Sequence, residues 1–248
     1  MKRGLSLVGA ALLLLAGPAG VARAEFLVNL QGAAVFTGSN DVRIPGDGGT
    51  MISFSDELAA DTAFSGRIEA GYLRRDRDYF GVVAAPLRVD SHGSVDRDVD
   101  FAGTRFPAGT QLDGTFRFDS YRLTWRRKFF PGKNFDLWLG LTANVRDAAI
   151  TLDGGGQRAE KTNTGVVPLI NFLADWRFAP LWSLRVAGDA LVASQGRAED
   201  VLFAVVREVG KKTKLFAGYR ILEGGADNDE VYTFSLFHYV VAGAETRF

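Results

Sequence analysis

The chain has two histidines, His92 and His238, so a site that needs an imidazole as a general base has two candidate positions. Asp90 precedes His92 at the Asp-x-His spacing of a carboxylate-assisted hydrolase, and Ser94 follows it at the His-x-Ser spacing of a serine hydrolase. Ser235 lies three residues before His238, so on a strand their side chains would point to opposite faces. Both histidines are catalytic candidates, and neither has a complete set of partners nearby in the sequence.

A second group of polar residues consists of arginines and acids. They occupy every second position, on one face, of segments in which apolar and polar residues alternate. If those segments are strands of a barrel, this parity faces a narrow interior, where charges are tolerated only when paired and hydrogen-bonded. Arginines outnumber acids, so the alternatives are a structural ion-pair core and a small, mildly anion-attracting channel. The set is Arg67, Glu69, Arg88, Asp90, Arg122, Arg126, Asp136, Arg146, Asp175, Arg177, Arg185, Asp189, Arg220, Glu245 and Arg247.

The elements that would position these residues are strands, because apolar residues recur at every second position through about ten segments. The alternation is clearest from Phe135 to Arg146. Phe116 and Phe118 take the opposite parity to Tyr121, which predicts a bulge near residues 119–120. The predicted strands are residues 26–37, 64–72, 79–90, 114–129, 135–146, 166–178, 182–192, 201–209, 215–221 and 231–248.

The connections between these segments alternate strictly in length. Short periplasmic turns and longer external loops are typical of outer-membrane barrels, with both termini on the periplasmic side. The tight connections are residues 75–78, 130–134, 179–181 and 210–212. The long ones, rich in Gly, Asp, Asn and Ser, are residues 38–61, 91–113, 153–164, 194–200 and 223–230.

Residues 1–24 have the three parts of a cleaved secretory signal. Lys2 and Arg3 precede an apolar run that is too short for a permanent transmembrane helix, and Ala22-Arg23-Ala24 forms the cleavage site. We expect residues 25–248 to form one domain with 26 Lys+Arg against 29 Asp+Glu, a balance with no basic surplus for nucleic acid. Zero cysteines exclude disulfides and thiolate chemistry.

Alternation alone also fits a soluble barrel with an apolar interior. Here the polar parity mixes small residues with charges of both signs, as a crowded lumen requires, and aromatic residues gather toward the predicted strand ends, as in interfacial girdles. The chain ends on Phe248 after an extended segment, as do terminal strands recognised for outer-membrane assembly. We therefore predict an all-β, antiparallel, up-and-down transmembrane barrel of about ten strands in the bacterial outer membrane, surrounded by its lipid and lipopolysaccharide.

Three kinds of outer-membrane hydrolase provide the enzymatic alternative. An omptin-type protease needs a second acid pair beside its Asp-x-His element, and none is evident around His92. A lipid A deacylase needs His and Ser on one strand face, and an outer-membrane phospholipase needs aromatic and Asn-Gly surroundings that His92 lacks. We predict a non-enzymatic protein, structural or weakly conducting, and keep a membrane-embedded hydrolase using His92 or His238 as the alternative.

The long connections are the predicted contact surfaces for lipopolysaccharide, a small solute or a surface partner, above all residues 38–61 and 91–113. Residues 95–101 are also compatible with strand extensions outside the membrane. The acidic segment 222–230 has enough oxygen ligands for calcium but not the spacing of an EF-hand or a glycine-rich nonapeptide, which favours a solvated turn. No metal or other cofactor is predicted.

Three stretches carry a resemblance to a known family: Ser120-Tyr121-Arg122-Leu123-Thr124-Trp125, Gln195-Gly196-Arg197-Ala198-Glu199-Asp200, and residues 222–232. From about Asp119 onward, the sequence resembles a family of uncharacterised bacterial outer-membrane barrel proteins. The resemblance covers about half of the chain. It implies an outer-membrane barrel, implies no activity, and transfers no functional residue.

Overall fold

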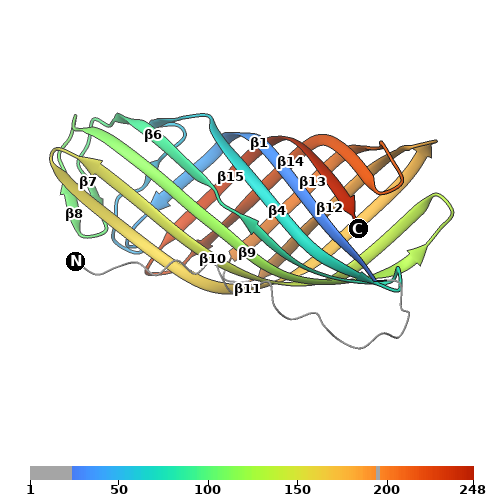
Figure 1. Cartoon of the computed structure of the whole chain (residues 1–248). Helices are drawn as coiled ribbons and strands as arrows, with labels where there is room; N and C mark the ends of the chain where they lie inside the picture. Colours follow the sequence, from blue (N-terminus) through green and yellow to red (C-terminus); the bar gives the residue numbers. More distant parts are fainter. Residues whose placement is uncertain (1–23, 194–195) are drawn as a thin grey trace, which may run out of the picture.

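The computed structural model describes residues 24–193 and 196–248, and these residues form a closed antiparallel barrel of ten strands (Figure 1). The predicted signal segment lies outside the described residues, apart from Ala24. The barrel strands are β1 (Ala24–Arg43), β4 (Ala63–Arg74), β5 (Asp78–Ala85), β9 (Gln111–Pro131), β10 (Phe135–Gly154), β11 (Gln157–Ala179), β12 (Trp182–Ala193), β13 (Gly196–Glu208), β14 (Thr213–Asp227) and β15 (Tyr232–Arg247). No helix in the described part of the chain is long and apolar enough to cross a membrane.

Closure comes from β1, which pairs with β15 from Leu27↔Arg247 to Arg43↔Tyr232 and with β4 on its other edge. Every other pair joins neighbours in the chain, with β5 lying between β4 and β9. The predicted up-and-down order of ten strands is therefore confirmed. A closed barrel pairs the backbone donors and acceptors within the hydrocarbon without leaving a strand edge exposed to lipid.

Five shorter strands complete the fold at the end opposite the chain's C-terminus: β2 (Ile52–Ser53), β3 (Leu58–Ala60), β6 (Arg88–Ser94), β7 (Val99–Phe101) and β8 (Thr104–Phe106). β6 continues β5 after a break at Pro86, because both pair with β9. β3 pairs with β6, β2 pairs with β1, and β7 and β8 form a separate hairpin.

The outward face of the barrel carries a belt of exposed apolar side chains. Phe64 is 83% exposed and Leu141 61%, whereas the alternate residue Thr142 is buried in the interior. Such exposure of large apolar side chains around a closed sheet is stable only against lipid. The belt includes Leu30, Phe64, Ile68, Val82, Leu123, Leu141, Val166, Ile170, Phe203, Val205 and Val240.

The interior of the barrel is polar and charged at the level of the belt and mainly apolar beyond it. This difference corrects the predicted positions of two charged residues. In the half beyond the belt, most of the buried residues are apolar: Leu87, Val89 and Phe116 point inward, while Arg88 and Asp90 lie on the outer face. Our placement of Arg88 and Asp90 in the lumen was therefore wrong, because this half protrudes into water and has an apolar core like that of a soluble barrel.

The same change explains the parity switch in β9. The ladder between β9 and β10 is regular through Asp119↔Asp147 and Ser120↔Arg146, and its irregularity lies between Leu137 and Trp138 instead. The predicted bulge near residues 119–120 is therefore wrong. Phe116 and Phe118 face the apolar interior, and Tyr121 faces the belt, on one continuous strand.

Most of the predicted long connections are strand. β10 and β11 continue to a turn at Gly155 and Gly156, whose φ angles of +57° and +79° favour glycine. Residues 153–164 and most of 223–230 therefore form projecting hairpins rather than loops. Polar residues on both strand faces suggested loops in the sequence, but above the belt both faces meet water or polar neighbours.

The β7–β8 hairpin folds over the outer end of the barrel as a plug. Val99, Phe101 and Phe106 are fully buried against Ile52 and Phe54. The backbone N–H of Ala102 donates to Ile44 O (2.8 Å), and that of Thr50 donates to Asp100 O (2.8 Å). Residues 95–101 thus help to close the outer end.

Candidate functional site

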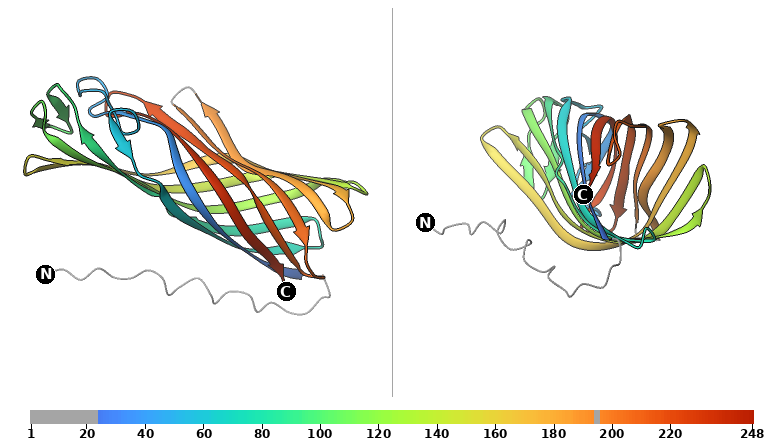
Figure 2. Two further views of the ribbon diagram at one scale, coloured as in Figure 1. Left: turned by 90° about the horizontal axis from the view of Figure 1, so that it is seen from above. Right: turned by 45° about the vertical axis from the view of Figure 1, so that its right-hand side comes forward.

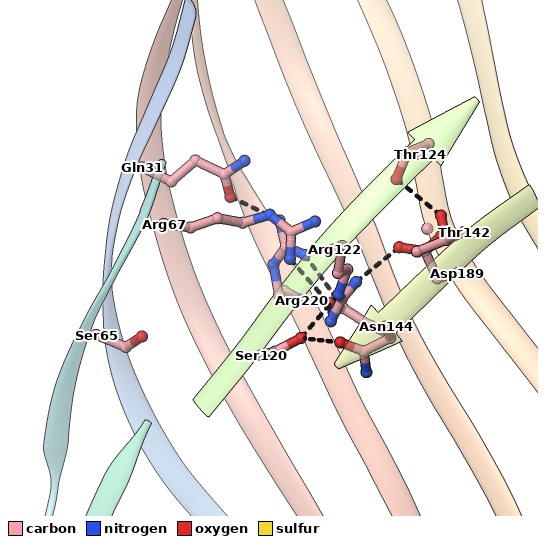
Figure 3. Close-up of polar contacts among 12 residues, drawn as sticks. Gln31, Ser65, Arg67, Ser120, Arg122, Thr124, Thr142, Asn144, Asp189 and Arg220 are labelled. Atoms are coloured by element: carbon pink, nitrogen blue, oxygen red, sulfur yellow. Dashed lines mark hydrogen bonds and ion pairs between the residues drawn. The ribbon is translucent and has the colours of Figure 1, made fainter. Parts of the chain in front are cut away.

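Three arginines, Arg67, Arg122 and Arg220, converge in the middle of the lumen (Figure 3). All three contact one carboxylate, that of Asp200. The carboxylate of Asp200 accepts from Arg67 on β4 (2.9 Å), Arg122 on β9 (2.6 Å) and Arg220 on β14 (2.6 Å). A single carboxylate cannot neutralise three guanidinium groups. The surplus positive charge is shared with a second carboxylate, Asp189, through Arg122.

Asp189 organises the second part of this cluster. It accepts hydrogen bonds from Arg122 Nη1 (2.6 Å), Thr142 Oγ1 (2.6 Å) and Asn171 Nδ2 (2.8 Å). Ser120 accepts from Arg122 Nε at 2.9 Å. All five side chains are buried, and nearly every donor faces an acceptor, which is the condition under which buried charges are tolerated.

A third group lies closer to the periplasmic end. Arg185 donates to both oxygens of Asp175 (2.8 and 2.9 Å) and to Glu245 on β15 (2.8 Å). Tyr79 donates to Glu69 at 2.7 Å, and the guanidinium of Arg126 lies over the Tyr79 ring, 4.1 Å from its centroid.

Some of these contacts join neighbouring strands, but the central ion pairs cross the lumen between strands that are not neighbours. Arg122 on β9 and Asp200 on β13 are separated around the barrel by β10, β11 and β12. Arg185 on β12 and Glu245 on β15 are separated by β13 and β14. We call this network of crossing ion pairs, built around Asp200, Asp189 and Arg185, the lumen brace. It fills the centre of the barrel with side chains.

A side pocket of about 120 Å³ lies beyond the lumen brace, toward the outer end of the barrel. Its floor is formed by Arg122, Asn144, Asp189 and Asp200 of the brace. Its walls are mainly apolar and aromatic and come from β9, β10, β11, β13, β14 and β15. The charged wall residues are Arg146, Lys161, Arg197, Glu199 and Glu223. The walls include Phe116, Phe118, Arg146, Ala148, Leu169 and Phe237.

His92 lies on the outer face of β6, away from the interior. Its Nδ1 is 2.6 Å from Asp113 Oδ1, and its Nε2 is 3.3 Å from Asp61 Oδ2. Asp90, the acid of the Asp-x-His element, instead accepts from Arg88 and Thr115. In the described part of the chain, no serine hydroxyl contacts His92, so its two carboxylates orient an imidazole that has no nucleophile.

His238 faces outward from β15, near the outer edge of the belt. Its Nδ1 forms a short hydrogen bond with the Tyr219 hydroxyl, and the two rings are stacked with centroids 5.9 Å apart. Ser235 points inward to Asn40, as its three-residue separation from His238 predicted. His238 is thus an interfacial aromatic contact.

Comparison with solved structures shows which kind of barrel this is. The outer membrane protease OmpT from Escherichia coli matches with a TM-score of 0.55 and 9% identity, over 90% of this chain and 97% of that chain. The chain has the fold of a bacterial outer-membrane β-barrel. At 9% identity the match shows the fold alone. The exposed apolar belt agrees with that fold, since it needs lipid around it, and the protein lies in the bacterial outer membrane.

Other solved outer-membrane barrels match less closely. Neisserial surface protein A has a TM-score of 0.37 and 17% identity, over 90% of this chain and 97% of that chain. Ail of Yersinia pestis has a TM-score of 0.39 and 13% identity, over 91% and 99%. The sequence matches no protein-family model and no curated protein.

Most of the predicted lumen residues lie inside this outer-membrane barrel, in three separate places. The lumen brace and its periplasmic neighbours contain Arg67, Glu69, Arg122, Arg126, Asp175, Arg185, Asp189, Arg220 and Glu245. Asp136, Arg177 and Arg247 line a wider space of about 300 Å³ at the periplasmic mouth. Arg146 lies apart, in the side pocket.

Asp200, the centre of the brace, is missing from the predicted set because the sequence predicts a loop at residues 194–200. Strand β13 has apolar residues on both faces, so alternation does not show which of its residues face the lumen. The hairpin register would have identified it: Ala193 pairs with Gly196, which places Asp200 directly opposite Asp189.

His92 is expected to titrate above its ordinary pKa of 6.5, because it is hydrogen-bonded to Asp113 and both Asp113 and Asp61 stabilise its cation. With the pKa raised on folding, the associated stability is present below pH 6.5 and lost as the pH rises through the folded-state value. NMR titration of the imidazole in a His238→Gln background would measure this pKa. Asp113→Asn should lower it more than Asp61→Asn, and an unchanged pKa in Asp113→Asn would contradict the assignment.

Proposed function

We propose that this outer-membrane barrel is a non-enzymatic, closed barrel that acts through its cell-surface half. The observation that supports the proposal is the lumen brace, which joins strands on opposite sides of the barrel with buried ion pairs. A conducting pore needs a water-filled path, but here charged groups bind one another across the axis and the β7–β8 plug closes the outer end. The weakly conducting alternative is therefore less well supported than the closed one.

Planar-bilayer recording tests the closed lumen. Purified barrel, with folding verified by heat-modifiable migration on gels, is expected to add no discrete current steps, while a general porin in the same preparation conducts. Stepwise currents that scale with the amount of folded protein would show an open lumen and refute this part of the proposal.

The hydrolase alternative rests on one observation, the placement of His92 between two carboxylates. Its position on the outer face places it outside the side pocket and outside the space at the periplasmic mouth, the two sizeable cavities described above. Ester, peptide and lipopolysaccharide hydrolysis assays compare the wild type with a His92→Ala/His238→Ala double variant. We expect no difference, and hydrolysis that the double variant loses would favour the enzyme.

The charge pairing on the cell-surface half indicates which kind of partner to expect. Several of its exposed arginines are paired with acids, as in Arg97–Glu57, Arg105–Asp98 and Arg158–Asp153. Paired charges offer less attraction to the phosphates of lipopolysaccharide than free arginines would. This pattern favours recognition of a particular small solute or surface partner over broad binding to anionic surfaces.

A further inference from the structure

The barrel wall has a gap beside the side pocket. β11 pairs with β10 along its whole length, but its pairing with β12 ends at Ile170↔Ala190. Residues 157–169 of β11 therefore have no strand partner on their second edge among the described residues. Figure 2 shows the β10–β11 hairpin (yellow) and the β12–β13 hairpin (orange) diverging at this end.

One ion pair bridges the gap. Lys161 Nζ on β11 is 2.9 Å from Glu230 Oε2, in the turn between β14 and β15. Within the described parts of the chain, this is the single side-chain hydrogen bond or ion pair that joins residues 157–169 to β12, β13, β14 or β15 or their turns. The Glu230 side chain is 77% exposed, so the bridge is weak and can open at little cost.

The side pocket opens at this gap, because both flanks of the gap line it. Lys161, Asn163 and Leu169 contribute from β11, and Ala198 and Gly224 from β13 and β14. Val166 is the outermost exposed apolar residue of β11, and the outward-facing residues Thr162 and Thr164 beyond it are polar. The gap therefore begins at the outer edge of the lipid belt and opens to water above it.

Arg146 gives the pocket an unpaired positive charge. Its Nη2 donates to the neutral Asn163 (3.0 Å), and its buried Nε has no partner in the described structure. The other pocket-lining cations are each paired with an acid: Arg122 with Asp189, Lys161 with Glu230, and Arg197 with Glu223. A half-buried guanidinium without a carboxylate provides a binding position for an anion.

The rest of the pocket suits a small apolar group. Phe116 packs against Phe237 with ring centroids 5.3 Å apart and against Phe118 at 6.4 Å, beside Ala148 and Leu169. A cavity of about 120 Å³ is of the size that holds a benzene ring in an apolar protein interior. The charged groups of the floor, Arg122, Asp189 and Asp200, are already paired with one another within the lumen brace, so the floor does not require a second charged group on a ligand.

We infer that the side pocket is a binding site for a small apolar monocarboxylate, an aryl or short alkyl acid, whose carboxylate pairs with Arg146. The acid enters from the cell exterior through the gap between β11 and the β12–β13 hairpin, when the Lys161–Glu230 bridge opens. The inference deepens the proposed cell-surface function, and it needs no passage through the lumen.

Ligand-observed ¹⁹F NMR with 4-fluorobenzoate, on the folded protein in a non-ionic detergent, tests the site. We expect saturable binding above the signal of empty micelles, weakened about tenfold or more by Arg146→Gln, since a charge-assisted hydrogen bond is lost. The control Arg158→Gln removes an exposed arginine of the same hairpin and should leave binding unchanged. Neutral 4-fluorobenzamide should bind equally weakly to the wild type and to Arg146→Gln.

Two further variants separate the site from general effects on folding. Ala148→Phe fills the pocket and should abolish 4-fluorobenzoate binding in a barrel that still shows heat-modifiable migration. Because the chain has no cysteine, Lys161→Cys/Glu230→Cys can be joined by a reducible bis-thiosulfonate crosslinker. The crosslink should slow ligand association at least tenfold, and reduction should restore it.

Absence of saturable binding, or equal binding in Arg146→Gln and Arg158→Gln, would overturn the inference, and unchanged association in the crosslinked protein would overturn the entry route. Hexanoate competition shows whether alkyl acids share the site. The bilayer experiment is independent: a silent barrel without binding refutes this inference alone, whereas current steps refute the closed lumen.

Discussion

Replacing Asp200 by alanine should destabilise the folded barrel by about 3–5 kcal/mol, the range for removing one partner from a buried ion pair. Asp200 is bound to Arg67, Arg122 and Arg220, and all four side chains are at most 15% exposed. The substitution leaves three guanidinium groups facing one another with Asp189 as the remaining carboxylate of the cluster. Cooperative urea unfolding in lipid vesicles measures the change.

The matched control is Asp153→Ala, which removes a carboxylate paired with the exposed Arg158 on the projecting hairpin. An exposed pair contributes little, so we expect a change within about 0.5 kcal/mol. Asp200→Asn keeps an acceptor and should fall between the two. Equal effects of Asp200→Ala and Asp153→Ala would show that the lumen brace does not stabilise the barrel.

Ile170→Arg should destabilise the barrel by about 2–4 kcal/mol if its side chain lies near the bilayer midplane, and by less toward the interface. Ile170 is 54% exposed on the outer face of β11, where it pairs with Leu141 in the belt. In water, a charge at such an exposed position would change stability by no more than about 0.5 kcal/mol. The prediction therefore separates lipid from water as the medium around this face.

Thr162→Arg is the control on the same strand and the same outward face. Thr162 lies beyond Val166, on the hairpin that projects above the belt, so we expect its replacement to be neutral. Unfolding in vesicles compares the two variants directly. A neutral Ile170→Arg would argue that the exposed apolar belt does not contact lipid.

The Asp200 variants test the interior of the barrel, and the Ile170 variant tests its outer face. The brace holds charges inside the barrel by pairing them, and the belt excludes charge from the outside. Above the belt the apolar residues lie inside, because there water surrounds the barrel. Leu87 and Val89 are buried at this level, whereas Leu123 and Leu141 are exposed in the membrane.

The sequence predicted the ten-strand barrel because closure in lipid imposes a regular period, and that period is visible in residues such as Leu137, Leu139 and Leu141. The sequence-based prediction was wrong about the orientation of Phe116, Leu87 and Val89, which point inward. Alternation shows that the two faces of a strand differ, but it does not show which face points inward. The projecting hairpins were predicted as loops because a strand that extends into water can be polar on both faces, so it shows no apolar alternation.

By itself, then, the sequence determined the architecture, the membrane and the presence of many charges on the lumen side. The tertiary structure alone decided which charges meet. Asp200 is central because hairpin register and barrel closure bring β4, β9 and β14 to it. Arg146 faces the pocket beside the edge where β11 leaves β12 above Ile170, and no carboxylate of the described residues reaches it. Contacts across a barrel depend on register around the whole ring, and no local pattern in the chain records that register.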